Sequence, residues 1–200
     1  LKSLYEKALS FDDVIGLSIG TRTDCVTDEI LDFLYEKSKE KEIWIEYGIQ
    51  SFFQTTLDKI NRADNIENMR YWIKRTKDKG LNVCGHLIYG LPDENQEMML
   101  ETFKQTIDLK VDSIKFHPLY VVKNTLLTNE FKKGRFTPIS EDLYIDTVVK
   151  SIINLPQNVS VQRVTAGIDD DTLLSPLWCK NKHQQMKSIR VALEEKGFIY

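Results

Sequence analysis

The residues best suited to chemistry in this chain are Gln50, Ser51 and Arg62. Gln50 and Ser51 stand where an alternating stretch of aromatic and β-branched residues, 44–50, passes from a predicted strand into a loop. The amide of Gln50 both donates and accepts, which suits a pair of vicinal hydroxyls, and the guanidinium of Arg62 is a fork for a carboxylate or phosphate. Because ligands bind at the carboxyl ends of parallel strands, these residues indicate a binding site. An ordinary strand–helix unit with polar surface residues is the alternative.

Four more predicted strands bring glycines or hydrogen-bonding side chains to the same rim. These residues are Arg22, His86, Gly90, Leu91, Pro92, Lys115, His117 and Arg163. Strands buried on both faces rarely contain Lys, His or Arg, which favours a functional rim. Gly90, which has no Cβ, would let adenine or ribose lie against the backbone. The structural alternatives are a hydrogen-bonded core histidine, a lysine whose ammonium reaches water, a strand end and a simple turn.

Strands and helices alternate along the chain at intervals of roughly 30 residues, the length of a βαβ unit. The predicted strands are residues 14–21, 44–50, 81–89, 111–122 and 159–165. The predicted helices include residues 27–41, 65–79, 95–109, 125–133, 140–155 and 177–196. This order predicts right-handed βαβ units around a parallel sheet, in one α/β domain over residues 1–200.

Composition limits the function classes. The net charge of −3 gives no general attraction to nucleic acid, so RNA binding would need a local basic patch. Lys74, Arg75, Lys77 and Lys79 on one predicted helix could supply it, although a solvated helix face is the simpler interpretation. The three separated cysteines form neither a disulfide framework nor a metal-ligand cluster, which favours a reducing cytoplasm. No membrane-spanning run, signal peptide, GxGxxG, P-loop or HExxH motif is present in the sequence.

Several segments together resemble radical S-adenosylmethionine (SAM) enzymes. They are GLSIGTRTDC (residues 16–25), WIEYGIQS (44–51), CGHLIYGLPDE (84–94), IKFHPLYVVKNT (114–125) and QRVTAG (162–167). Within that family the chain is most similar to the bacterial YhcC-type proteins, which are related to the Elp3 and oxygen-independent coproporphyrinogen oxidase branches. The resemblance covers nearly all of the chain.

The resemblance implies a partial parallel (β/α)6 barrel, truncated at its amino-terminal end and followed by a carboxy-terminal extension. It implies two cofactors, SAM and a [4Fe–4S] cluster that reductively cleaves SAM to a 5′-deoxyadenosyl radical. An electron donor such as flavodoxin or ferredoxin would be a partner. Relatives on the Elp3 side act on the wobble uridine of tRNA, so tRNA is a candidate substrate.

The resemblance also implies roles for the rim residues. Gln50 and Ser51 would touch the ribose hydroxyls, Arg62 would pair with the methionine carboxylate, and Gly90, Leu91 and Pro92 would flank the adenine. His86 stands where some relatives carry an acidic residue that contacts the ribose. The residues expected to face substrate or cofactor are Arg22, Lys115, His117 and Arg163.

The chain departs from the family in lacking the CxxxCxxC loop that holds the cluster. Cys25, Cys84 and Cys179 are too far apart in sequence to replace it, so we expect no metal site in this chain and no SAM cleavage by it alone. We expect it to be the carboxy-terminal part of a longer enzyme. The predicted strand 14–21 would then be an uncovered edge through which the chain self-associates.

Two other functions remain open at the level of sequence. The first is a different TIM-barrel-like lyase or aldolase that uses Lys115 as a Schiff-base amine. The second is a non-catalytic binding domain, for which changes at Gln50 or Arg62 would have no effect on activity.

Overall fold

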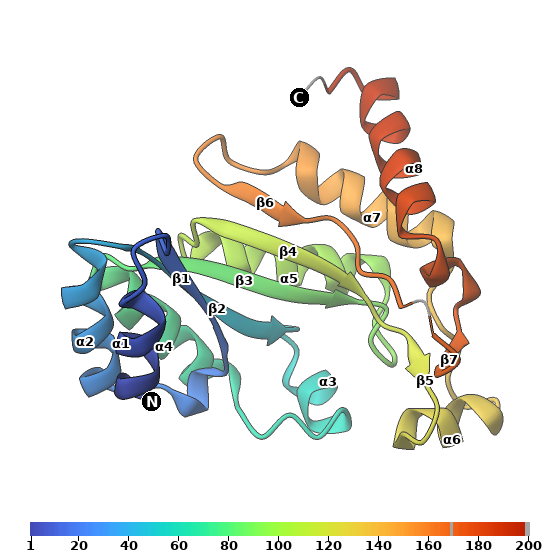
Figure 1. Ribbon diagram of the computed structural model, residues 1–200. Helices are drawn as coiled ribbons and strands as arrows, with labels where there is room; N and C mark the ends of the chain where they lie inside the picture. The colour runs from blue at the N-terminus through green and yellow to red at the C-terminus, as the bar shows by residue number, and fades with distance from the viewer. Residues whose placement is uncertain (169, 199–200) are drawn as a thin grey trace.

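The computed structural model describes residues 1–168 and 170–198 and contains an open parallel sheet with the strand order β1-β2-β3-β4-β6 (Figure 1). The strands are β1 Gly16–Thr21, β2 Glu42–Gln50, β3 Asn82–Tyr89, β4 Ser113–Pro118 and β6 Ser160–Arg163. Every neighbouring pair in this sheet is parallel. The predicted α/β class is confirmed, and the sheet is open along its edges rather than closed into a barrel.

A helix crosses between each two successive strands of this sheet. The crossover helices are α2 Asp28–Ser38, α4 Ile66–Asp78, α5 Gln96–Asp108 and α7 Glu141–Ile153, with the short α3 Gln54–Lys59 ahead of α4. Thr27, Asn65, Asn95 and Ser140 cap the four crossover helices by accepting a hydrogen bond from a first-turn backbone N–H. These caps mark the helix starts that the sequence predicts.

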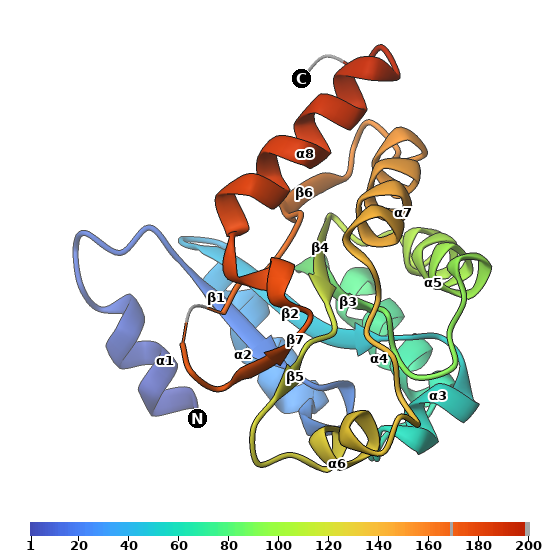
Figure 2. The same cartoon turned by 90° about the vertical axis from the view of Figure 1, so that its right-hand side faces the viewer.

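The remaining elements precede β1 or follow β1, β4 or β6 along the chain. They are α1 Lys2–Leu9, α6 Leu126–Lys132, α8 Lys182–Glu195, two 3-10 turns at Thr23–Cys25 and Leu177–Lys180, and the antiparallel pair β5 Val121–Val122 and β7 Leu173–Ser175. In Figure 2, α6 and α3 lie at the lower edge of the molecule, with the β5–β7 pair above α6.

One face of the sheet is buried under helices and the other is partly open. Tyr47 of β2 bonds Thr76 of α4 at 2.8 Å, and Tyr89 of β3 bonds Ser151 of α7 at 2.8 Å, both in the core on the helix side. Alternate residues of β2 are only partly buried, because their side chains point to the opposite face. The assumption that these strands are buried on both faces was therefore wrong. The polar side chains lie on the open face.

Two predicted elements are divided in the structure. The strand predicted over residues 111–122 ends at Pro118, after which Leu119 N–H donates once more to Tyr89 O of β3 at 2.8 Å, and it resumes as β5 in the small sheet. The last helix is interrupted at Asn181, whose side chain caps α8. Within the described residues β1 pairs only with β2, so self-association through its other edge stays a prediction. No helix of the described chain has the length and apolar character needed to cross a membrane.

Candidate functional site

Four side chains from adjacent strands meet on the open face and form what we call the Glu46 cluster: Ser18, Glu46, His86 and Lys115. Lys115 Nζ lies 2.5 Å from Glu46 Oε2, and His86 Nε2 lies 2.7 Å from the same oxygen. Ser18 Oγ donates to the other oxygen, Oε1. The side chains of Glu46 and Lys115 are only 11% and 13% exposed. A single carboxylate therefore holds groups from β1, β3 and β4.

These contacts determine the proton positions in the cluster. Burial raises the pKa of Glu46, but hydrogen bonds from Lys115, Ser18 and His86 outweigh it and bring the pKa down to about 2. Burial lowers the pKa of His86 despite its contact with Glu46, so the ring is neutral at neutral pH. A neutral ring facing a carboxylate carries its proton on Nε2, which leaves Nδ1 as an acceptor.

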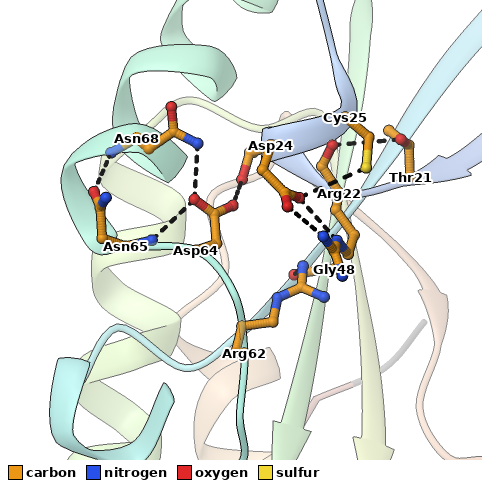
Figure 3. A network of polar contacts seen from close by, with 10 residues as sticks. Thr21, Arg22, Asp24, Cys25, Gly48, Arg62, Asp64, Asn65 and Asn68 are labelled. Atoms are coloured by element: carbon orange, nitrogen blue, oxygen red, sulfur yellow. Dashed lines mark hydrogen bonds and ion pairs between the residues drawn. The ribbon is translucent and has the colours of Figure 1, made fainter. Parts of the chain in front are cut away.

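A second group lies where β1 and β2 end, and we call it the arginine corner: Arg22, Asp24, Gly48 and Arg62 (Figure 3). Arg62 Nη2 donates to Gly48 O at 2.6 Å, whereas its buried Nε has no hydrogen-bond partner among the described residues. Arg22 Nε donates to Asp24 Oδ1 at 2.8 Å. Burial lowers the pKa of Arg62, and the nearby charge of Arg22 lowers it further. Two guanidinium groups thus share one corner with Asp24, which pairs with Arg22, and with the nearby Asp64, whose charge partly opposes the lowering of the Arg62 pKa.

A hydrogen-bond network fixes the loop that carries Arg62. Asp64 accepts from Thr23 Oγ1, from Asn65 N at 2.9 Å and from Asn68 Nδ2 at 2.7 Å (Figure 3). These bonds connect the loop to the turn after β1 and to the start of α4. The Arg62 side chain is therefore held toward Gly48 by its surroundings.

The backbone at Gln50 has a strained conformation. Its φ is 69°, and Ser51 N–H donates to Ile49 O at 2.9 Å, which closes a tight three-residue turn at the end of β2. The register with β3 shifts at this point. A Cβ on Gly48 would lie 2.8 Å from Gln50 Nε2 and 3.5 Å from Arg62 Nη2. Glycine at position 48 thus allows the amide and the guanidinium to come together.

Two of the predicted contact residues have different surroundings from those expected. Ser51 is fully buried, and its hydroxyl donates to Glu94 and accepts from Phe53 N at 3.1 Å, so it is committed inside the fold rather than facing the rim. Gly90 has a φ of 88°, and a Cβ there would lie 2.7 Å from Ile139. Ile139 makes the close approach on the Cβ side of Gly90, so contact of this glycine with an adenine or ribose stays a prediction.

Leu91 and Pro92 line a pocket of about 770 Å³ beyond the carboxyl ends of β3 and β4. Its apolar walls also include Ile60, Ile88, Leu119 and Phe136. His117, which is on the open face, donates from Nδ1 to Pro118 O at 2.7 Å if its proton is on that nitrogen, and burial lowers its pKa. Arg163 is exposed on β6, in register with Lys115.

Glu46 and Ser18 are the two members of the Glu46 cluster that sequence analysis missed. Glu46 lies two residues before Gly48 and four before Gln50, so strand alternation puts all three on one face. A carboxylate in an otherwise bulky apolar strand was the available signal. Ser18 gave no comparable signal, because a serine in a partly exposed edge strand needs no special explanation.

Comparisons with known proteins agree with this fold. Residues 2–106 match the sequence model of the Radical SAM superfamily, and residues 111–195 match that of the Radical_SAM C-terminal domain. The chain belongs to the radical SAM superfamily. It is 37% identical over 198 residues to Protein YhcC of Escherichia coli (strain K12), covering 98% of this chain and 64% of that protein. The chain thus spans less than two thirds of this relative's length.

Two matches from the archaeon Methanocaldococcus infernus are more distant. The tRNA uridine(34) acetyltransferase of Methanocaldococcus infernus is 25% identical over 198 residues, which cover 93% of this chain and 36% of that protein. The structure of M. infernus Elp3 with an N-terminal deletion superposes with a TM-score of 0.79 at 23% identity, over 92% of this chain and 43% of that one. The resemblance to the YhcC-type and Elp3-like branch is confirmed.

The family implies SAM and a [4Fe–4S] cluster, and the two fit this chain differently. The buried, unbonded Nε of Arg62 beside a second guanidinium suits a carboxylate, which SAM carries. Within residues 1–168 and 170–198, no three His, Cys, Asp or Glu side chains form a group able to hold a metal ion. Cys84 and Cys179 are buried and Cys25 is exposed. The described residues therefore fit SAM but not the cluster.

Proposed function

We propose that the rim of this sheet binds SAM, with the arginine corner as the site for its methionine carboxylate. The observation that carries the proposal is Arg62, whose Nε is buried with no hydrogen-bond partner among the described residues, while Arg22 adds positive charge next to it. A carboxylate at this position would receive a charge-assisted hydrogen bond from Nε and would offset the repulsion between the two guanidinium groups.

The rest of the ligand has complementary groups nearby. The amide of Gln50, next to Arg62, can bond the ribose hydroxyls, and Nδ1 of His86 can accept from a hydroxyl because Glu46 fixes the proton on the other nitrogen. The pocket lined by Leu91 and Pro92 offers apolar walls for the adenine. Lys115, His117 and Arg163 then lie toward the side on which a substrate would approach.

In this proposal the chain binds and orients SAM, and the cluster is held by residues outside those described. When bound, the two cofactors would supply the radical chemistry of the family. A tRNA substrate is supported by the name of the M. infernus relative, and a protein electron donor such as flavodoxin or ferredoxin would complete the system.

The arginine corner can be tested by titrating this chain with SAM and with adenosine, which lacks the carboxylate. Arg62→Gln should weaken SAM binding by about 1.5–3 kcal/mol, the range for a hydrogen bond to a charged group, and leave adenosine binding unchanged. Arg190→Gln on the exposed surface of α8 is the matched control and should affect neither ligand. Isothermal titration calorimetry gives all six affinities. Equal losses for SAM and adenosine, or no loss at all, would contradict the proposal.

The Schiff-base alternative at Lys115 has less support. Its Nζ lies 2.5 Å from the Glu46 carboxylate, and its side chain is only 13% exposed. The amine is therefore held in the Glu46 cluster, and this contact would have to break before it could attack a carbonyl. The non-catalytic alternative predicts that Arg62→Gln leaves the activity of the full-length protein intact, so an activity assay of that variant separates it from the proposal.

A further inference from the structure

The region around α6 carries positive charge that the chain as a whole lacks. A second pocket, of about 530 Å³, lies beside the one described above, and the two share Leu126 and Asn129 of α6. Two lysines, Lys123 and Lys132, line this smaller pocket. The larger pocket is lined by Lys59, Lys133 and Arg135. The two pockets together thus have five cationic side chains and one carboxylate, that of Glu130. The chain's net charge is −3, so this is a local basic surface.

Several of these charges are available to a ligand. Lys123, Lys132 and Lys133 are exposed, and none of them forms an ion pair with any residue the structure describes. Lys59 and Arg135 pair with Asp93 and Glu130. The free cations are therefore concentrated on α6 and on the segment that leads into it.

The basic helix singled out in the sequence differs in this respect. Arg75 Nε lies 2.8 Å from Asp28, Lys77 Nζ lies 2.5 Å from Asp112, and Lys79 pairs with Asp32. Most of the positive charge on α4 is thus neutralised by its neighbours. The solvated-face interpretation fits α4 better than an RNA-binding role.

The smaller pocket also has neutral donors and a well-held backbone. Asn124, Thr125, Thr128 and Asn129 line it beside the two lysines. Lys123 N–H donates to Thr172 O at 2.8 Å, and Thr125 caps α6 by accepting from Thr128 N at 3.2 Å. Thr125 and Thr128 donate their hydroxyl protons to Val122 O, so the donors left for phosphodiester oxygens are the lysine ammonium groups and the amides of Asn124 and Asn129. An acidic protein surface would more commonly be met by a flatter face with an apolar centre.

We propose that the α6 surface, defined by Lys123, Lys132, Lys133 and the polar residues of the smaller pocket, binds the phosphodiester backbone of an RNA substrate. It adjoins the pocket assigned to the adenine, so a bound strand would pass next to the adenine end of the cofactor. The proposal rests on the proposed function for the identity of that neighbouring pocket. Binding of RNA to the α6 surface does not itself require SAM.

The test is fluorescence anisotropy of a labelled tRNA anticodon stem-loop transcript against this chain at a series of salt concentrations. Lys123→Gln combined with Lys132→Gln should weaken binding by roughly tenfold or more near 0.1 M salt and reduce the salt slope by about 1.4. The matched control is Lys74→Gln with Lys104→Gln, which removes two exposed lysines from α4 and α5 and should leave affinity and slope nearly unchanged. Thermal melting checks that both double variants fold.

Three results would overturn the proposal. The first is an equal effect of the two double variants, and the second is no binding of the stem-loop to the wild-type chain. The third is that Lys123→Gln with Lys132→Gln abolishes binding of labelled flavodoxin, measured by the same anisotropy assay, but leaves RNA binding intact. The last would assign the surface to an acidic protein. Because Arg62→Gln is measured separately with SAM and adenosine, failure of the RNA proposal and failure of the SAM proposal give different patterns.

Discussion

The Glu46 cluster and the arginine corner lie on the same open face but differ in how their charges are paired. In the Glu46 cluster one carboxylate accepts from Ser18, His86 and Lys115, so every charge has a partner. In the arginine corner Asp24 pairs with Arg22, whereas Arg62 has Asp64 nearby but forms no ion pair with it, and its buried Nε has no hydrogen-bond partner among the described residues. The first arrangement stabilises the sheet and orients its own members. The second is suited to an external anion.

The largest expected effect follows from removing the carboxylate at the centre of the Glu46 cluster. Glu46→Met leaves the Lys115 ammonium, whose side chain is 13% exposed, without a counter-charge. Breaking a buried pair from one side costs about 3 to 4 kcal/mol of unfolding free energy. Urea unfolding of the variant measures this loss.

The control for this prediction is the double variant Glu46→Met with Lys115→Met. Removing both charges should recover most of the lost stability, because the cost comes from the unpaired ammonium rather than from the missing contact. Simple additivity of the two single changes would show that the pair is not coupled. The Glu46 cluster would then not differ from the arginine corner in how tightly its charges are paired.

The same carboxylate predicts a pH dependence. Its folded pKa is lowered from 4.5 to about 2, so its contribution is present above pH 4.5 and is lost as the pH falls toward 2. That contribution is at most about 3 kcal/mol. The difference in stability between the wild-type protein and Glu46→Gln should therefore shrink over this range. A difference that stays constant from pH 5 to pH 2 would mean that Glu46 titrates normally.

The sequence predicted which strand positions form the rim better than it predicted the contacts that individual rim residues make. Strand alternation and the carboxyl-end rule placed Gln50, His86 and Lys115 near one another, because both depend only on local periodicity and parallel topology. The roles of Ser51 and Gly90 could not be predicted in this way. They depend on Glu94 and Ile139, which lie 43 and 49 residues further along the chain and reach them only through tertiary packing.

The charged surfaces show the same limit. Lys74 to Lys79 are adjacent in sequence and looked like a basic patch, yet Asp28, Asp32 and Asp112 from other elements neutralise three of them. The lysines of the α6 surface drew no attention in the sequence, because what distinguishes them is the lack of an ion pair with any described residue, although Asp170 lies near Lys123 and Glu130 near Lys133. The net charge of a surface depends on which side chains are neighbours in space. The composition could therefore show that RNA binding needs a local basic patch, but not where that patch lies.

The smallest effect on stability is expected from the arginine corner. Arg62→Gln removes the 2.6 Å hydrogen bond to Gly48 O, but it also removes a partly buried charge that lies close to Arg22. The two changes oppose each other, so the unfolding free energy should fall by about 1 kcal/mol or less. Urea unfolding beside Glu46→Met measures the contrast directly. If the two variants were equally unstable, Arg62 would be a structural residue whose charge the fold already compensates, and the reason for assigning it to the carboxylate of SAM would disappear.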